Sequence, residues 1–214
     1  MANAWSRNHP WAVVYDFMVE RSAIGKVLWR VGLNSDIDEL YRAADEIGTL
    51  PDDAAVLDIP CGGGVALRGV RAGQKLRYVA ADISTDMLAR TRDEAAKRGL
   101  AIELAEEDAA GLSFGDATFD LVVCFTSLHC FPDPAGSVKE FGRVLKPGAA
   151  ISGSAMLTDV SLIYKPVFVA GKLGGLLGPG GTTDDLRRWL TDAGFEDLRI
   201  RRSGGMTYFH GRRA

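Results

Sequence analysis

The chain has 214 residues, of which 47% are hydrophobic and 25% are charged, and its 25 basic and 28 acidic residues leave a formal net charge of −3. This balance is typical of a soluble globular protein and excludes disordered, collagen-like and coiled-coil classes. Because the two charge signs are mixed along the chain, nucleic acids are not expected partners. No run approaches the ~18 apolar residues of a membrane span, so no integral membrane contact is expected. The three cysteines form no C-x-x-C pair, which favours a cytoplasmic location.

The predicted helices show apolar residues every three or four positions and end at glycine or proline, and the predicted strands are short apolar runs. The first helix has Ser35 and Asp38 as its start signal and Gly48 as its stop. In chain order, the pattern predicts a helix at 36–47, strands at 54–59 and 76–82, a helix at 84–98, strands at 101–104 and 119–125, a helix at 133–145, a strand at 149–155, a helix at 183–193, and strands at 195–202 and 206–211.

Strands that alternate with helices of this length indicate parallel βαβ units with helices on both faces of one sheet. The last two strands flank Ser203-Gly204-Gly205 and are too close to pair except as a hairpin. The sequence therefore predicts an α/β fold: a doubly wound, Rossmann-like, seven-stranded, mostly parallel sheet with a C-terminal antiparallel hairpin and an N-terminal helical cap.

We interpret residues 1–214 as a single domain, because neither an internal repeat nor a second core is visible. Its parts are the helical cap (1–48), the sheet core (50–156), a variable segment (157–182) and the C-terminal helix and hairpin (183–214). Within the variable segment, residues 171–181 contain six glycines and a proline. This glycine-rich segment is either a flexible connector or a lid that closes over a ligand.

A glycine loop and an acidic residue follow the first two predicted strands. Residues 56–64 read VLDIPCGGG, and Asp82 ends the next strand. Backbone without side chains lets a ligand approach closely, and a carboxylate at Asp82 can accept two hydrogen bonds from a ribose diol. Open α/β sheets bind ligands at the carboxyl ends of their strands, where both features lie.

A dinucleotide site has similar features, but its G-x-G-x-x-G loop leaves the helix N-terminus free for a pyrophosphate anion. Here Asp58 stands at the strand end and would repel that anion. The same carboxylate suits a ligand with an ammonium group and a positively charged sulfur, both of which S-adenosylmethionine carries.

The chain resembles the class I S-adenosylmethionine-dependent methyltransferases, and specifically their small bacterial type 11 family. The motifs that carry the resemblance occur in the family's order over about residues 50–156: VLDIPCGGG (56–64), VAADIS (79–84), EEDAAGLSF (106–114), FDLVVCFTSLHCFPDP (119–134) and EFGRVLKPGA (140–149). Pro60 departs from the glycine of many members and stiffens the loop, and Ser113 replaces a usual proline.

The resemblance implies S-adenosylmethionine as the cofactor and assigns roles to individual residues. Asp58 and the loop around Pro60, Cys61, Gly62 and Gly64 would hold the methionine portion, and Asp82 would hold the ribose. Ile83 and Met87 would pack on the adenine, Asp108 would accept from its amino group, and the Ala109 N–H would meet a ring nitrogen. Phe125 and Thr126 would close the pocket, and Tyr15 would shield the cofactor.

Methyl transfer needs mainly positioning, so a catalytic residue is optional. His129 follows the fourth strand and is the candidate general base for a hydroxyl acceptor; the alternative is a histidine that only packs the fold. A thiol nucleophile at Cys61 or Cys130 is disfavoured. The histidines lack metal-ligand spacing, so no metal is expected.

The aromatic side chains in 1–35 and 157–182 either pack the cap on the sheet or line a pocket for a hydrophobic methyl acceptor, which would be methylated on oxygen or carbon by in-line displacement. Two other functions stay open: an NAD(P)-dependent Rossmann oxidoreductase, and a non-catalytic relative that binds S-adenosylmethionine. The identity of the acceptor and the oligomeric state do not follow from the sequence.

Overall fold

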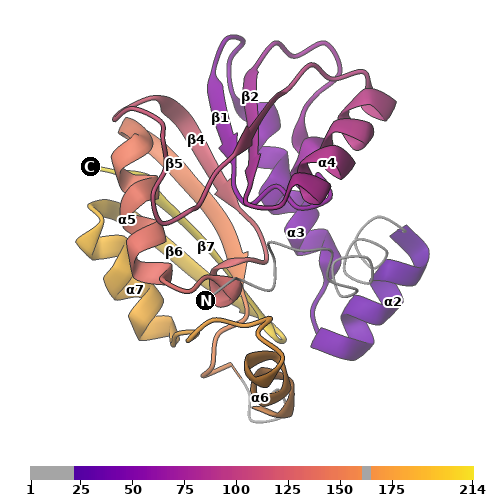
Figure 1. Cartoon of the computed structure of the whole chain (residues 1–214), viewed down its shortest axis with the longest axis vertical. Helices are drawn as coiled ribbons and strands as arrows, with labels where there is room; N and C mark the ends of the chain where they lie inside the picture. Colours follow the sequence, from indigo (N-terminus) through magenta and orange to yellow (C-terminus); the bar gives the residue numbers. More distant parts are fainter. Residues whose placement is uncertain (1–21, 161–164) are drawn as a thin grey trace.

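A seven-stranded sheet forms the centre of the computed structural model, which describes residues 22–160 and 165–214 (Figure 1). The strands are β1 (Ala55–Asp58), β2 (Arg77–Asp82), β3 (Glu103–Glu106), β4 (Phe119–Cys124), β5 (Leu145–Ala155), β6 (Phe195–Ser203) and β7 (Met206–Arg213). The helices are α2 (Ser22–Leu33), α3 (Ile37–Ala44), α4 (Thr85–Arg98), α5 (Pro134–Val144), α6 (Lys165–Leu173) and α7 (Thr183–Asp192), with 3₁₀ turns η2 (Asp45–Thr49), η3 (Val65–Gly69) and η4 (Leu128–Cys130).

The order of the strands across the sheet is β3-β2-β1-β4-β5-β7-β6. Strands β1 to β5 pair in parallel, and β7 pairs antiparallel with both β5 and β6. The predicted fold class, with its mostly parallel sheet and C-terminal hairpin, is confirmed.

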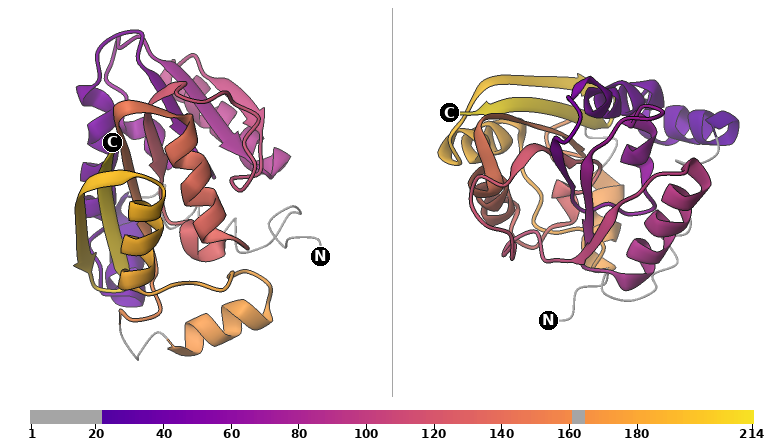
Figure 2. Two further views of the ribbon diagram at one scale, coloured as in Figure 1. Left: turned by 90° about the vertical axis from the view of Figure 1, so that its left-hand side faces the viewer. Right: turned by 90° about the horizontal axis from the view of Figure 1, so that it is seen from above.

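The central strands are buried on both faces, as their nearly unbroken apolar sequences predict. Alternate residues point to opposite sides, so two apolar layers form. Val56 and Leu121 pack with residues of α3, η3 and α4, whereas Leu57 and Val122 pack with residues of α5 and α7. Helix α6 lies beyond the end of the sheet where β5 leads out, and its Phe168 is buried against the apolar layer that contains Val56 (Figure 2).

Two glycines allow the backbones of neighbouring elements to touch. A Cβ atom on Gly69 of η3 would lie 1.9 Å from the carbonyl oxygen of Ala44, and one on Gly142 of α5 would lie 2.6 Å from that of Ala193. Both distances are shorter than van der Waals contact, so only glycine fits at these crossings.

The helical cap differs from the expectation at its capping residue. Asp36 caps α3, because its side chain accepts a hydrogen bond from the Asp38 N–H at 3.0 Å. The Ser35 hydroxyl instead donates to Ser203 Oγ at 3.1 Å. The Gly205 N–H also donates to the Leu33 carbonyl at 2.6 Å. The predicted start at Ser35 is therefore wrong, and these contacts join the cap to the β6–β7 hairpin.

The junction of α5 and β5 also differs. The helix ends at Val144 and the strand begins at once with Leu145, which pairs with Phe119 of β4, whereas the expected strand starts at 149. Lys146 in this stretch contacts Asp120 of β4 at 2.8 Å. Strand pairing and this ion pair therefore extend the strand through Pro147 and Gly148, which the sequence pattern assigns to a turn.

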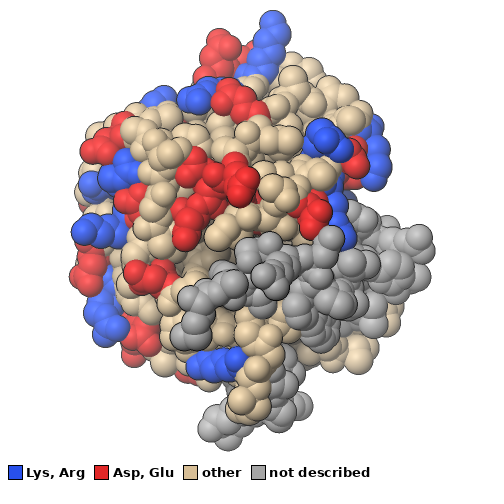
Figure 3. All heavy atoms as spheres, in the orientation of Figure 1, with Lys and Arg blue, Asp and Glu red and all other residues tan. Residues whose placement is uncertain are grey.

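No helix in the described ranges is long and apolar enough to cross a membrane. On the face seen in Figure 3, acidic and basic side chains of the described residues intermix, and the basic ones form no continuous patch there.

Candidate cofactor-binding and active site

The predicted site residues of β1 and β2 lie side by side at the carboxyl edge of the sheet. Asp58 is the last residue of β1 and pairs in register with Ala80 of β2, so Asp82 lies two residues further along the neighbouring strand. Residues two apart on a strand point to the same face, which puts the two carboxylates on the side covered by η3 and α4.

The glycine loop is held by backbone contacts on both sides. The Cys61 N–H donates to the Ala81 carbonyl at 2.8 Å, and Thr91 Oγ1 of α4 donates to the Gly62 carbonyl at 2.6 Å. Gly62 and Gly64 have φ angles of +52° and +84°, a conformation that disfavours any other residue. A Cβ atom on Gly62 would meet nothing within 4 Å, so the loop leaves open space beside its backbone. Pro60 enters this loop through a cis peptide bond.

Asp82 is buried, and backbone N–H groups contact both of its carboxylate oxygens. The Gly62 N–H donates to Oδ2 at 3.0 Å and the Ser84 N–H donates to Oδ1 at 2.9 Å. Each carboxylate oxygen can accept a second hydrogen bond. Asp82 therefore fixes the glycine loop at the end of β2, where its carboxylate lies beside the open space next to Gly62.

Asp58 is only 2% exposed, and its Oδ2 accepts a hydrogen bond from the Tyr78 hydroxyl at 2.8 Å. Burial raises the pKa of this carboxyl to about 7; the Tyr78 hydrogen bond lowers it, and the charge of Asp82 adds to the rise. Tyr78 is a functional candidate that is not part of any of the family motifs in this sequence. Its position four residues before Asp82 on one strand was the available signal.

The residues expected around the adenine follow β2 and β3. Ile83, which precedes α4, and Met87, in the first turn of α4, are half-buried. The Glu107 N–H donates to the Asp82 carbonyl at 3.2 Å, which ties the segment after β3 to the end of β2. In that segment Asp108 is exposed and accepts from the Ala110 N–H at 3.0 Å, and Ala109 is buried.

Phe125 and Thr126 follow β4, as expected. Phe125 is buried, and Thr126 has a φ angle of +55°. The Thr126 N–H donates to Ser154 Oγ of β5 at 3.0 Å, which holds this strained residue in place. The structure thus brings the described candidates of β1, β2, β3 and β4 to one edge of the sheet. Tyr15 lies outside the described residues.

His129 is buried in η4, and burial lowers the pKa of its imidazole to about 4. Its Nδ1 accepts a hydrogen bond from the Met156 N–H at 3.2 Å. A neutral ring that accepts at Nδ1 carries its proton on Nε2, so neither nitrogen is free to take a proton. This contact disfavours the base role and favours the structural alternative.

The three thiols are not activated. Burial raises the pKa of Cys124 and of Cys130 to about 12 and holds that of Cys61 well above its usual value. A neutral thiol is a poor nucleophile, so these cysteines are unsuited to nucleophilic catalysis.

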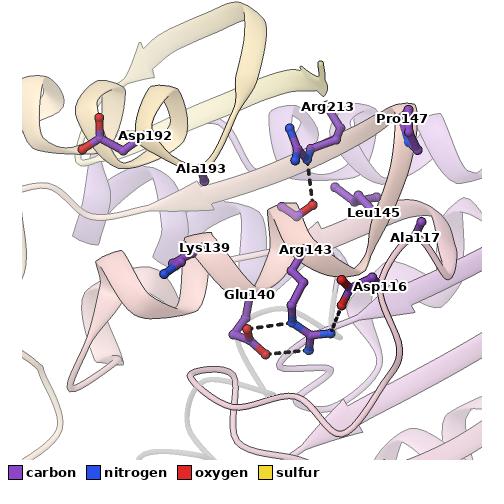
Figure 4. Close-up of a pocket in the computed structure, with 11 residues that line it drawn as sticks. Asp116, Ala117, Lys139, Glu140, Arg143, Leu145, Pro147, Asp192, Ala193 and Arg213 are labelled. Atoms are coloured by element: carbon purple, nitrogen blue, oxygen red, sulfur yellow. Dashed lines mark hydrogen bonds and ion pairs between the residues drawn. The ribbon is translucent and has the colours of Figure 1, made fainter.

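A cavity of about 430 Å³ lies elsewhere, between the loop before β4, the start of β5, α5 and the end of α7 (Figure 4). This is the amino edge of β4 and β5, opposite the edge that carries the candidate site. Arg143 in this cavity contacts Glu140 at 2.7 Å and Asp116 at 2.8 Å, so its charge is already paired. The cavity belongs to the packing of α5 against its neighbours and not to the cofactor site.

The donor set fits S-adenosylmethionine better than a dinucleotide. Asp58 is buried and makes no ion pair with any residue that the structure describes, which suits an ammonium group, and the Asp82 carboxylate suits a ribose diol. Two carboxylates flanking the glycine loop would repel a pyrophosphate.

Known proteins agree with this assignment. Residues 56–148 match the family model described as a methyltransferase domain. A ubiquinone/menaquinone biosynthesis C-methyltransferase of Neisseria meningitidis is 35% identical over 52% of this chain and 45% of its own length. A ubiquinone biosynthesis O-methyltransferase of Alkalilimnicola ehrlichii is 30% identical over 72% of this chain and 64% of its own length. The fold resembles that of phosphoethanolamine N-methyltransferase 2 of Haemonchus contortus, solved with S-adenosyl-L-methionine, with a TM-score of 0.73 and 14% identity over 94% of this chain and 56% of that one.

Fold, site and family model agree on one class: residues 56–148 match a methyltransferase domain, and the fold is that of class I enzymes. The expectation of an S-adenosylmethionine-dependent methyltransferase is confirmed at the level of this domain. The chain spans less than two thirds of the length of either relative, so the acceptor and the activity of the whole protein are matters for proposal.

Proposed function

We propose that the chain transfers a methyl group from S-adenosylmethionine to an oxygen or a ring carbon of an apolar, aromatic small molecule. The observation that carries the proposal is an apolar wall at the carboxyl ends of β4 and β5. Phe125, Met156 and Phe168 are buried in one contiguous cluster, and Leu177 packs against it. The names of the relatives, which act in quinone biosynthesis, support a ring-shaped acceptor.

In this proposal the cofactor supplies an activated methyl group for in-line transfer, and the protein binds and orients. Asp82 accepts from the ribose hydroxyls, and Asp58 faces the methionine ammonium group. Asp108 accepts a hydrogen bond from the adenine amino group, and the Ala109 N–H donates to an adenine ring nitrogen. Ile83 and Met87 pack on the adenine, and Phe125 with Thr126 closes the site. Holding two reactants in line can supply ~7–11 kcal/mol of the barrier. The acceptor atom forms its bond to the methyl group as the sulfur–methyl bond breaks, S-adenosylhomocysteine leaves, and the acceptor's proton is released to the solvent.

The glycine-rich segment 171–181 acts as a lid over the acceptor in this proposal. Its Gly178 N–H donates to the His129 carbonyl at 2.9 Å, and a Cβ atom on Gly178 would lie 1.9 Å from the Phe131 carbonyl oxygen. These contacts support a segment that packs on the loop after β4 and carries Leu177 to the apolar wall.

The test is an acceptor screen with isotopically labelled S-adenosylmethionine. Phenols and hydroquinones with apolar substituents should gain the label, and polar amines and nucleosides should not. The Asp82→Ala variant should bind S-adenosylhomocysteine at least tenfold more weakly, since each charged hydrogen bond contributes ~1.5–3 kcal/mol. Its folding is checked by circular dichroism.

Parallel calorimetric titrations with S-adenosylhomocysteine and NADH separate the rival functions. Binding of NADH alone would support the oxidoreductase and contradict the proposal. Binding of S-adenosylhomocysteine with no transfer to any aromatic acceptor would support the non-catalytic alternative.

A further inference from the structure

The two buried carboxylates of the site differ in how they are held. Asp82 receives one backbone N–H on each oxygen, from Gly62 and Ser84. Among the residues that the structure describes, the only hydrogen bond to the Asp58 side chain comes from the Tyr78 hydroxyl, at 2.8 Å. The charged form of Asp58 therefore depends on one neutral donor.

Among the described residues, the titratable groups that face Asp58 include no positive charge. They are Tyr78 and Asp82 of β2, Cys61 of the glycine loop and Cys124 of β4. Burial holds the pKa values of Tyr78 and of both thiols above their usual range, so these groups stay neutral near pH 7. Asp82 adds a like charge, and the Tyr78 hydroxyl alone favours the carboxylate of Asp58.

We propose that Tyr78 is a positioning residue for the cofactor: its hydroxyl keeps Asp58 charged and turned toward the methionine ammonium group, which makes cofactor affinity depend on pH near neutrality. The proposal rests on the proposed function, in which Asp58 faces that group. Tyr78 and Asp58 lie on adjacent strands of one sheet face, so the hydroxyl acts through Asp58 and needs no contact with the cofactor.

Binding is then coupled to the release of a proton. Below pH 7 part of the free protein carries a protonated Asp58, and an ammonium group that binds beside it favours loss of that proton to the solvent. At pH 6 the number released approaches about nine tenths of a proton per site, and at pH 8 it falls to about one tenth. Affinity for a ligand with the ammonium group should fall about tenfold from pH 8 to pH 6.

The experiment is calorimetric titration of the full chain at pH 6, 7 and 8 with two ligands. S-adenosylhomocysteine carries the ammonium group, and 5′-methylthioadenosine lacks the amino-acid portion. Titrations in two buffers of different ionisation enthalpy count the protons released. The variants are Tyr78→Phe, Asp58→Asn and the double variant. Tyr208→Phe is the matched control, because Tyr208 is also buried but lies on β7, with β1, β4 and β5 between it and β2.

Tyr78→Phe should weaken S-adenosylhomocysteine binding at pH 7 by about tenfold, with partial recovery at pH 8, because one hydrogen bond to the charged form is lost. It should change 5′-methylthioadenosine binding less than about twofold. Asp58→Asn should bind S-adenosylhomocysteine weakly at every pH without proton release. Adding Tyr78→Phe to Asp58→Asn should have no further effect, and Tyr208→Phe should behave like the wild type.

Three results would overturn the proposal: equal losses for both ligands in Tyr78→Phe, additive effects in the double variant, or an S-adenosylhomocysteine affinity in the wild type that is flat from pH 6 to pH 8. The proton count needs only the wild-type protein, so a variant that fails to fold does not prevent the test. If neither ligand binds the wild type at any pH, the proposed function itself fails, which is a separate outcome.

Discussion

At the scale of single residues, the buried Asp58 lowers the stability of the fold while it serves cofactor binding. Its pKa is about 7 in the folded chain and near its ordinary value of ~3.9 in the unfolded chain. The unfolded chain therefore ionises first as pH rises, and stability falls between about pH 4 and pH 7. A buried carboxyl kept for an ammonium group costs folding free energy at neutral pH.

Asp58→Asn should thus stabilise the cofactor-free chain at pH 8 by up to about 4 kcal/mol, and hardly at all at pH 4. Urea unfolding at the two pH values measures the difference. Asp82→Asn is the control, and it should be destabilising because an amide cannot accept on both sides from Gly62 and Ser84. A gain from Asp58→Asn that is equal at pH 4 and pH 8 would contradict this account of Asp58.

His129→Asn tests the role of the buried imidazole, because an asparagine oxygen can accept the Met156 N–H in place of Nδ1. We expect kcat to stay within about threefold of the wild type and the affinity for S-adenosylhomocysteine to be unchanged. A loss of about a hundredfold or more in kcat at constant affinity is what removal of a general base produces, and it would restore the base role.

At the scale of elements, the apolar pattern locates the helices by their periodicity and the central strands by their nearly continuous apolar runs. The helices α3, α4, α5 and α7 and most strands overlap the predicted ranges closely, whereas β3 spans Glu103–Glu106 and so begins two residues after its predicted start at 101. The boundary between α5 and β5 escaped prediction, since Leu145 is a strand residue only because Phe119 is its partner. Helix α6 lies in the variable segment, for which no element was predicted.

The residues of the site also fall into two groups, those that the sequence predicts and those that only the structure reveals. Asp58, Asp82 and the glycine loop are visible in the sequence because each ends or follows a strand. Tyr78 was missed because its role depends on the pairing of β1 with β2, and the His129 tautomer depends on the Met156 N–H. Contacts of this kind join residues far apart in the chain. The local pattern places Tyr78 on the same strand face as Asp82, but it does not reveal Asp58 as its partner.

Gly178→Ala tests the lid, because the added methyl group cannot fit against the Phe131 carbonyl oxygen. The segment should lift from the loop after β4, which should raise KM for the acceptor several-fold and leave the affinity for S-adenosylhomocysteine unchanged. Gly115→Ala is the control, since its Cβ would make an ordinary contact, 3.7 Å from Thr118 Oγ1. An unchanged KM in Gly178→Ala would return the segment to the role of a connector.

At the scale of the whole molecule, the interpretation as one domain predicts a single cooperative unfolding transition. S-adenosylhomocysteine at about a hundred times its Kd should stabilise the folded chain by about 2.7 kcal/mol. That corresponds to a rise of about 5–10 °C in Tm for a chain of this size. Scanning calorimetry with and without the ligand measures both. Asp82→Ala should lose the shift, and two separate transitions would contradict the single domain.

The position of β7 between β5 and β6 bears on how the chain is synthesised. Strand β5 leaves the ribosome well before β7, with which it pairs on the side away from β4. The hydrogen-bonding edge of β5 is therefore unpaired while the segment between the two strands is synthesised. An open edge next to a finished parallel sheet invites pairing with another nascent chain. Stalled translation between β5 and β7 should therefore leave a product that aggregates, and chaperones that shield strand edges should matter most during that interval.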